Sequence, residues 1–227
     1  EKTSFAMASQ DVRYYLNGIL LEVSPSQINV VATDGHRLAW SSCKIKTDFT
    51  DQKIIIPRKS ALELQKLLNL YPDNVNIAFN SNQLKVSSDE YTFISKLIEG
   101  SYPDYEKVFP KGTEQKLKAN KSLVQTALNR AAVLSNEKYR GVKFILEKDN
   151  LKICANNPSK ESAEEEVLVE YSGDSFEIGF NISYVQESLS VISNNEVEFV
   201  FFGSENSCLV KNIDDESLIH VIMPMRL

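Results

Sequence analysis

The chain has 227 residues, of which 42% are hydrophobic and 25% are charged, a composition typical of an ordinary globular protein. Its formal net charge of −6 argues against a protein that holds nucleic acid by bulk electrostatic attraction, but it does not exclude a local basic lining. No apolar run approaches the roughly 18 residues of a membrane span, and EKTSFAMASQDVRYY lacks the features of a signal peptide.

Three cysteines, Cys43, Cys154 and Cys208, stand far apart in the sequence without the CxxC spacing of a metal site. An odd number without a pairing framework is typical of a reducing compartment, so we expect a cytoplasmic protein with buried structural thiols. The sequence also lacks a Walker loop and a GxGxxG motif. We therefore predict no cofactor and no metal site.

The first half of the chain predicts a hairpin, then a strand that runs into a helix, then further strands. A polar turn with Pro25 separates two alternating apolar runs, RYYLNGILLEV and SPSQINVVATDG. A short strand and a helix are predicted in IIIPRKSALELQKLL, with Pro57 in the first helical turn. Successive strands joined by Asn/Ser turns are predicted in NVNIAFNSNQLKVSSDEYTFISKLI. The apolar stripe of the helix comprises Leu62, Leu64, Leu67 and Leu68.

The second half predicts the same order, preceded by a strand and a helix in QKLKANKSLVQTALNRAAVLS. The first half has only EKTSFAMAS at this place and is expected to begin midway through its first helix. A strand pair follows in KYRGVKFILEKDNLKICANNP, then a strand and helix in FEIGFNISYVQESLSVI with Asn181 as N-cap. A run of strands is predicted in EVEFVFFGSENSCLVKNIDDESLIHVIMP. The apolar face of the extra helix is predicted to comprise Leu123, Ala127, Leu128 and Ala131.

The two halves are related by a nearly constant offset, which indicates an internal duplication. Anchor pairs lie about 122 to 125 residues apart, namely Arg13 with Lys138, Pro57 with Asn181, and Val75 with Val197. We expect domains 1–112 and 113–227, because FPKGTEQ between them is polar and rich in chain-breaking residues. Each domain is predicted to be an antiparallel β-sheet packed with two helices, an α+β architecture.

Several motifs in this order resemble the bacterial DNA sliding clamp, the β subunit of the DNA polymerase III holoenzyme. The motifs are QDVRYYLNG, VATDGHRLA, IIIPRKS, SKLIEGSYPDYEKVFP, NRAAVLSNEKYRGV, IGFNISYV and VIMPMRL. The resemblance covers essentially the whole chain. It implies the middle and C-terminal clamp domains without the N-terminal domain, so we expect a fragment.

A clamp of this family is a non-enzymatic processivity factor for DNA polymerase. Two subunits of three similar domains close into a ring around duplex DNA, and the ring tethers the replicative polymerase, the clamp loader and repair proteins through short peptides. The resemblance therefore implies a homodimeric ring when the protein is full length and a mostly monomeric fragment here. ATP hydrolysis belongs to the separate clamp loader.

The resemblance also implies a hydrophobic peptide-binding groove with walls from both domains. The expected ligand carries a glutamine and downstream leucine or phenylalanine anchors. Lys107 stands where some relatives carry arginine, so a bidentate contact there is in doubt. The implied groove residues are Leu16, Thr33, Gly35, His36, Arg37, Leu38, Pro103, Lys107, Val108, Tyr139, Asn181, Tyr184, Ser207, Val221, Ile222, Met223, Pro224, Met225, Arg226 and Leu227.

Two further surfaces are implied by the resemblance. The DNA-facing candidates are Gln10, Arg13, Tyr14, Tyr15, Arg58 and Lys59. Scattered basic residues on helices are also what ordinary solubility requires, and the residues alone favour that interpretation. The subunit contact is expected at Val133 and Leu134 and at Glu161, Glu164 and Glu165 of the acidic run ESAEEEV. A metal-binding interpretation of that run is the weaker alternative, since acidic runs are usually solvated.

The segment Asp34-Gly35-His36-Arg37 has the residue types of a catalytic site. An alternative to the clamp is therefore an enzyme, a small hydrolase that uses Asp34 and His36. A hydrolase needs a nucleophile, a base and an orienting acid together. The only other histidine, His220, lies in an apolar strand, and the sequence has no GxSxG motif. Since Asp-Gly after a strand is a strong hairpin signal, we favour a turn. A partner-binding module without a DNA role is a second alternative.

Overall fold

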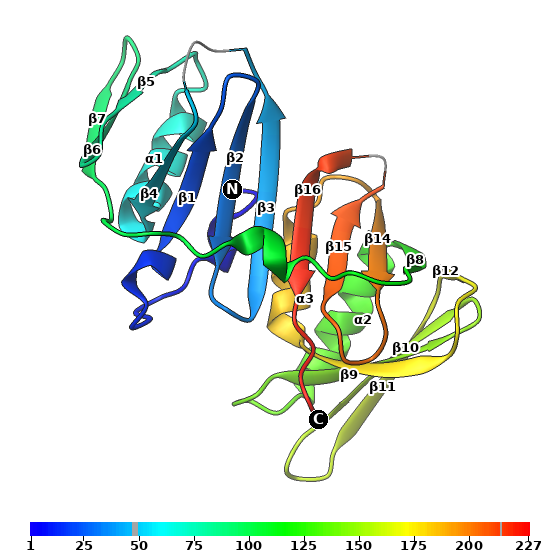
Figure 1. Cartoon of the computed structure of the whole chain (residues 1–227). Helices are drawn as coiled ribbons and strands as arrows, with labels where there is room; N and C mark the ends of the chain where they lie inside the picture. Colours follow the sequence, from blue (N-terminus) through cyan, green and yellow to red (C-terminus); the bar gives the residue numbers. More distant parts are fainter. Residues whose placement is uncertain (47–49, 214) are drawn as a thin grey trace. The chain divides into compact units, whose positions relative to one another are not determined.

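The computed structural model describes residues 1–46, 50–213 and 215–227, and they form two compact units, Glu1–Tyr105 and Glu106–Leu227 (Figure 1). The linker expected around residues 110–114 lies just inside the second unit. Asp214, within the last predicted strand run, is outside the described residues. Among the described residues, no helix is long and apolar enough to cross a membrane.

The first unit is built on an antiparallel sheet with the strand order β3-β2-β1-β4. Gly-Ile-Leu-Leu and Val-Val-Ala-Thr form its centre because β-branched and apolar residues pack well on a half-buried pleated surface. The β1–β2 hairpin places Val23 opposite Ile28, which confirms the predicted turn around Pro25. The strands are β1 Gly18–Val23, β2 Gln27–Thr33, β3 Arg37–Lys44 and β4 Gln52–Pro57.

Helix α1, Arg58–Leu70, follows β4 directly and packs against β1 and β4. Pro57 precedes the helix as its N-cap instead of lying in the first turn, because its ψ of 145° is extended. No residue of α1 is fully buried, since Leu64 and Leu68 line an open apolar pocket of about 440 Å³ in this unit. The remaining strands, in the order β5-β6-β7, are β5 Asn76–Phe79, β6 Gln83–Ser87 and β7 Thr92–Lys96.

The second unit has two sheets and two α-helices. One sheet has the order β11-β10-β9-β13, the same arrangement as β3-β2-β1-β4 in the first unit, which supports the internal duplication. Its strands are β9 Gly141–Glu147, β10 Asn150–Asn156, β11 Ser162–Leu168 and β13 Phe176–Asn181. The other sheet, in the order β12-β8-β14-β15-β16, contains β8 Gln115–Asn120, β12 Glu170–Tyr171, β14 Glu196–Phe201, β15 Cys208–Asn212 and β16 Asp215–Ile222.

Helices α2, Lys121–Val133, and α3, Ile182–Ser190, contact strands of both sheets and complete one core. Phe144 lies at its centre, with its ring centroid 5.4 Å from that of Phe180 and 6.3 Å from that of Phe199. One helix-face prediction was wrong: Leu123 is 56% exposed, and Val124 is the residue that packs inward with Ala127, Leu128 and Ala131.

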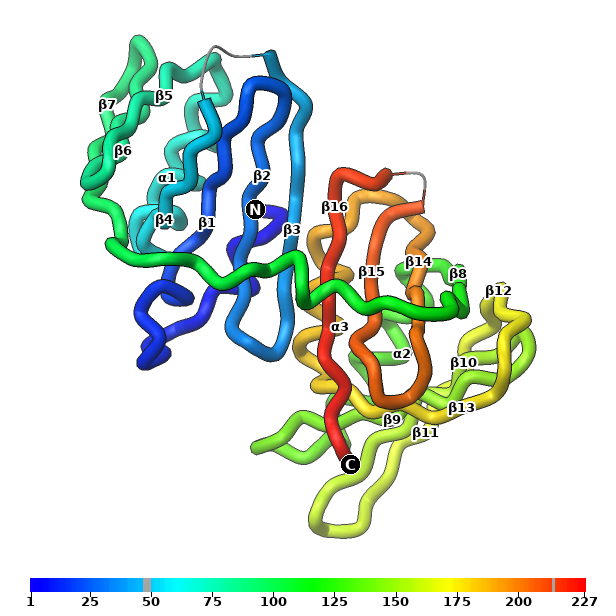
Figure 2. The backbone as a smooth tube through the Cα atoms, in the orientation of Figure 1, coloured from blue at the N-terminus to red at the C-terminus, as the bar shows by residue number. Residues whose placement is uncertain are grey.

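The α+β class and the antiparallel sheets are confirmed. In the first unit only a 3-10 turn, η1 Ser4–Ala6, stands where the second unit has α2, so among its described residues α1 is the single α-helix. The tube in Figure 2 traces the backbone through the strands and helices of each unit. The other 3-10 turns are η2 Tyr14–Leu16 and η3 Tyr105–Val108.

Candidate functional site

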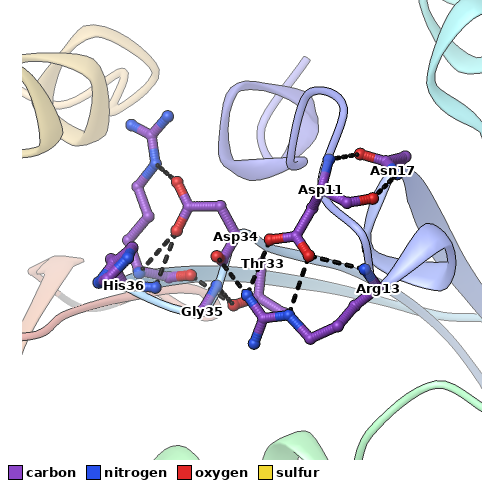
Figure 3. Close-up of polar contacts among 8 residues, drawn as sticks. Asp11, Arg13, Asn17, Thr33, Asp34, Gly35 and His36 are labelled. Carbon is purple, nitrogen blue, oxygen red and sulfur yellow. Dashed lines mark hydrogen bonds and ion pairs between the residues drawn. The ribbon is translucent and has the colours of Figure 1, made fainter.

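The turn between β2 and β3 is held by the side chain of Asp34 (Figure 3). Its Oδ1 accepts hydrogen bonds from the backbone N–H of His36 at 2.9 Å and of Arg37 at 3.1 Å. Its Oδ2 accepts from Nε of Arg37 at 3.0 Å. Gly35 has φ of +90°, a conformation that side chains disfavour, so glycine is required there. The predicted hairpin turn is confirmed by the pairing of Thr33 with Leu38.

Arg37 is buried, with 9% of the residue exposed, and it connects the turn to the start of the unit. Its NH2 donates to the carbonyl oxygen of Phe5 at 2.8 Å, and its guanidinium lies 5.3 Å from the centre of the Phe5 ring. The charge of Arg37 is therefore compensated inside the protein by Asp34 and Phe5. The side chain of His36, by contrast, is exposed.

A second network ties the loop before β1 to the same turn (Figure 3). Arg13 donates from Nε and NH2 to the two carboxylate oxygens of Asp11 at 3.0 and 2.8 Å, and NH2 also reaches the carbonyl oxygen of Asp34 at 3.4 Å. Asn17 bonds the backbone of Asp11 in both directions. The hydrogen bonds from Arg13 lower the pKa of Asp11 to about 2. The loop thus carries a fixed ion pair beside Gly35.

Thr33 connects the turn to the segment after β7. Its hydroxyl donates to the carbonyl oxygen of Arg37 at 2.6 Å, and its N–H donates to the hydroxyl of Tyr102 at 3.1 Å. Burial raises the pKa of Tyr102, so this phenol stays neutral and holds its place. Leu16 and Leu38 are buried, whereas Pro103 and Lys107 are exposed and Val108 is partly buried.

In the second unit, three of the predicted groove residues gather at the start of α3. Asn181 caps the helix, because its Oδ1 accepts from the N–H of Ser183 at 2.9 Å, as the sequence predicted. Its Nδ2 reaches the carbonyl oxygen of Tyr139 at 3.5 Å. The ring of Tyr139 is 58% exposed, and Tyr184 is partly buried against the core. Ser207 lies just before β15.

The C-terminal arm, which we define as residues 223–227, leaves β16 as extended backbone (Figure 2). Val221 and Ile222 before it are fully buried and anchor it in the core. Met223 is 37% exposed and Leu227 is 64% exposed. The N–H of Met225 donates to the carbonyl oxygen of Gly179 on β13 at 2.9 Å. The arm therefore lies against this strand and keeps apolar side chains accessible.

The DNA-facing candidates lie on the loop before β1 and at the start of α1. Gln10 and Tyr14 are exposed, and Gln10 has a positive φ of 60°. Arg58 donates from NH1 to the carbonyl oxygen of Met7 at 2.8 Å and so fixes that loop. Lys59 is exposed. All of these residues lie in the first unit. Arg13 and Arg58 also make hydrogen bonds to other residues of that unit. Tyr15 is partly buried, and its ring meets that of Tyr14 edge-on.

The acidic run forms β11, an edge strand of its sheet. Glu165 accepts from Arg130 on α2, and Lys152 on β10 lies 2.8 Å from Glu164 and 3.4 Å from Glu166. Val133 at the end of α2 is 78% exposed, Leu134 is partly buried, and Glu161 lies just before the strand. Across the described residues, no group of three or more His, Cys, Asp or Glu is placed to hold a metal ion.

Two family models match the chain in succession. The model of the central domain of the DNA polymerase III beta subunit matches residues 1–104, and that of its C-terminal domain matches residues 106–226. The chain belongs to the β sliding clamp family. The repeated strand order of the two units is therefore that of two successive clamp domains.

Individual clamps agree with this assignment. The chain is 47% identical to the beta sliding clamp of Pseudomonas aeruginosa, over all of the chain and 62% of that protein. A crystal structure of the P. aeruginosa DNA polymerase III subunit beta superimposes with a TM-score of 0.97, again over all of the chain and 62% of that structure. A P. aeruginosa clamp bound to griselimycin, 46% identical, superimposes with a TM-score of 0.94 over the same shares. The chain thus spans less than two thirds of these clamps.

Four residues of this region were not predicted from the sequence. Asp11 and Tyr102 support the turn, and Gly141 and Gly179 lie under the arm. The two glycines carried a usable signal, because a glycine inside a strand pattern such as FEIGFN often marks a close backbone approach. Asp11 and Tyr102 carried no such signal, because the hydrogen-bond partner of a polar loop residue depends on the tertiary structure.

Proposed function

We propose that the chain is part of a DNA polymerase processivity factor, a clamp that encloses duplex DNA and tethers the replicative polymerase and other DNA-handling proteins. The observation that carries this proposal is the presence of two units with one strand order, each matching a successive domain of the same clamp subunit. The clamp acts by topology and peptide binding, and it catalyses no reaction. The bonds that Asp34 makes within its turn support a structural role for TDGHR.

Partner proteins bind through short peptides, and each unit supplies candidate contact residues. In the first unit, the hydrogen-bonded turn presents the exposed side chain of His36, and Leu16 and Leu38 are buried candidates. In the second unit, exposed Tyr139 and the arm present apolar surface. Methionines in the arm suit this role, because their side chains adapt to ligands of different shape. The griselimycin complex of the P. aeruginosa clamp supports a ligand-binding surface in this family.

DNA is held without sequence preference. The exposed side chains of Gln10, Tyr14 and Lys59 are candidates for phosphate and sugar contacts. A net charge of −6 keeps such contacts few, so enclosure instead of adhesion provides the residence time on DNA. The proposed subunit contact comprises Glu164 and Glu165 of edge strand β11, Glu161 just before it, and Val133 and Leu134 at the end of α2.

Calorimetric titration with a clamp-binding peptide tests the proposal. The peptide carries a glutamine followed by leucine and phenylalanine anchors, and the same peptide with alanine anchors is the control. Two or three anchors worth roughly 1.5 to 3 kcal/mol each, less ordering costs, predict micromolar affinity. Deleting residues 223–227 is expected to abolish binding while the circular dichroism spectrum stays unchanged. Leu168→Ala removes apolar surface from exposed β11 and should have no effect.

Unchanged affinity after the deletion would show that the peptide site lies elsewhere. Equal binding of the alanine-anchored peptide would contradict recognition through apolar anchors. As a separate check on the hydrolase alternative, turnover of simple esters and phosphoesters should be absent and should not change with His36→Ala.

A further inference from the structure

The C-terminal arm lies on two strands at positions that have no side chain. In β9 the residues Val142 and Phe144 are buried, and in β13 Ile178 and Phe180 are buried. Because side chains alternate between the faces of a strand, Gly141 and Gly179 lie on the opposite, outward face. The outward face of this sheet therefore lacks side chains at Gly141 and Gly179, where the arm passes, and we call these two positions the glycine track.

The arm occupies this track in atomic contact. A Cβ atom on Gly179 would overlap the carbonyl oxygen of Met225, and it would lie 2.9 Å from Cγ of Leu227. A Cβ atom on Gly141 would overlap Cδ2 of Leu227 and would lie 3.9 Å from Cε of Met225. The hydrogen bond from the Met225 N–H to the Gly179 carbonyl holds the two backbones together at this point.

The two contacts differ in how easily they can relax. The overlap at Gly179 is with backbone, which cannot move aside without displacing the arm. The overlap at Gly141 is with the end of a leucine side chain, which can adopt another rotamer. Alanine at position 179 should therefore displace the arm more than alanine at position 141.

Local backbone geometry does not explain the glycines. Neither Gly141 nor Gly179 has a positive φ, unlike Gly35, Gly100, Gly112 and Gly203. An L-residue could adopt either conformation, and a glycine inside a strand weakens it. The close approach of the arm is the feature that requires the absence of a side chain.

We propose that Gly141 and Gly179 are positioning residues that hold the C-terminal arm on β9 and β13, and that this docking fixes Met223 for peptide ligands. The second part rests on the proposed peptide-binding function. The glycines act through the arm and do not touch the peptide themselves.

Methionine methyl NMR tests the docking directly. The chain has three methionines, and Met223 and Met225 are in the arm, whereas Met7 is 3% exposed in the first unit and serves as an internal reference. With ¹³C-methyl methionine, Gly179→Ala should shift and sharpen the Met225 signal while the Met7 signal stays in place. Gly141→Ala should produce a smaller change. Ser162→Ala, on β11 of the same sheet, is the control and should change none of the three signals.

Peptide titration tests the consequence. Gly179→Ala should weaken peptide binding about tenfold, which corresponds to about 1.4 kcal/mol of binding free energy. The change in unfolding temperature caused by Gly179→Ala should disappear in a chain that already lacks residues 223–227. If the substitution instead weakened β13 in general, the change would persist in that chain. If Gly179→Ala does not fold, Gly141→Ala still tests the proposal, because that change meets only a flexible side chain.

The outcomes separate this inference from the proposed function. An unchanged Met225 signal in both glycine variants overturns the docking. A mobile arm with unchanged peptide affinity overturns the link between docking and binding. If the unmodified chain binds no peptide, the proposed function fails, and the NMR measurement still decides whether the glycines hold the arm.

Discussion

The carboxylate of Asp34 and the guanidinium of Arg37 form a 3.0 Å ion pair that closes the turn between β2 and β3. Both side chains are largely shielded, at 17% and 10% exposure, so their interaction is stronger than that of a surface pair. The same carboxylate also accepts two backbone hydrogen bonds. This pair explains why a segment with the residue types of a catalytic site is a structural support.

Replacing Asp34 should therefore destabilise the first unit. Asp34→Ala removes the ion pair with Nε of Arg37 and two backbone hydrogen bonds, so we expect a loss of about 1–3 kcal/mol in the free energy of unfolding. Urea unfolding followed by tryptophan fluorescence measures it, because the single tryptophan, Trp40, lies in β3 of this unit. Asp89→Ala, at an exposed bend, is the control. A loss below about 0.5 kcal/mol, typical of ordinary surface substitutions, would contradict this role.

Duplex DNA should bind weakly to the isolated chain and with a steep dependence on salt. Non-specific contacts of a few basic residues predict dissociation constants of roughly 10⁻⁴ to 10⁻⁶ M at physiological salt. Lys59→Ala should weaken binding equally for all sequences and reduce the salt slope by about 1, as measured by fluorescence anisotropy. Lys85→Ala removes an exposed charge on β6 and serves as the control.

Removing Arg58 as well should weaken DNA binding further, although this variant also loses the bond to the Met7 carbonyl. Its fold must therefore be checked by circular dichroism. Strong preference for one DNA sequence would contradict the proposal, because discrimination requires contacts with base edges.

A polypeptide of residues 1–227 should be mostly monomeric in solution. Residues 1–227 match the central and C-terminal domains, whereas in the proposed clamp the surface that meets β11 would belong to the N-terminal domain of another subunit. Sedimentation velocity should give a species of 25.6 kDa at micromolar concentration. A tight dimer would show that β11 or another edge pairs with a second copy of this chain.

The three cysteines should react with a thiol reagent at different rates. Burial raises the pKa of Cys208, so this thiol stays protonated at pH 8 and reacts only when the chain unfolds. Burial also raises the pKa of partly exposed Cys154. Cys43 is exposed and should account for the fast phase, which Cys43→Ser should remove. Rapid modification of Cys208 in the folded protein would contradict its burial.

The sequence alone determined the order of strands and helices and the duplication. Alternation of apolar residues is a local property, so β1, β2, β9 and β10 could be predicted from their own residues. Asn181 as a helix cap and Asp34-Gly35 as a turn are local for the same reason. The family could likewise be recognised from short motifs, because they are contiguous in the chain.

The tertiary structure alone decided which distant residues meet. Leu123 and Val124 are adjacent apolar residues, and only the packing of α2 on its sheets selects Val124 for the core. The bonds of Arg37 to Phe5 and of Thr33 to Tyr102 join segments far apart in the sequence. The track of Gly141 and Gly179 has meaning only when β9 and β13 lie side by side and the arm crosses them, because a missing side chain has an effect only where another part of the chain comes close.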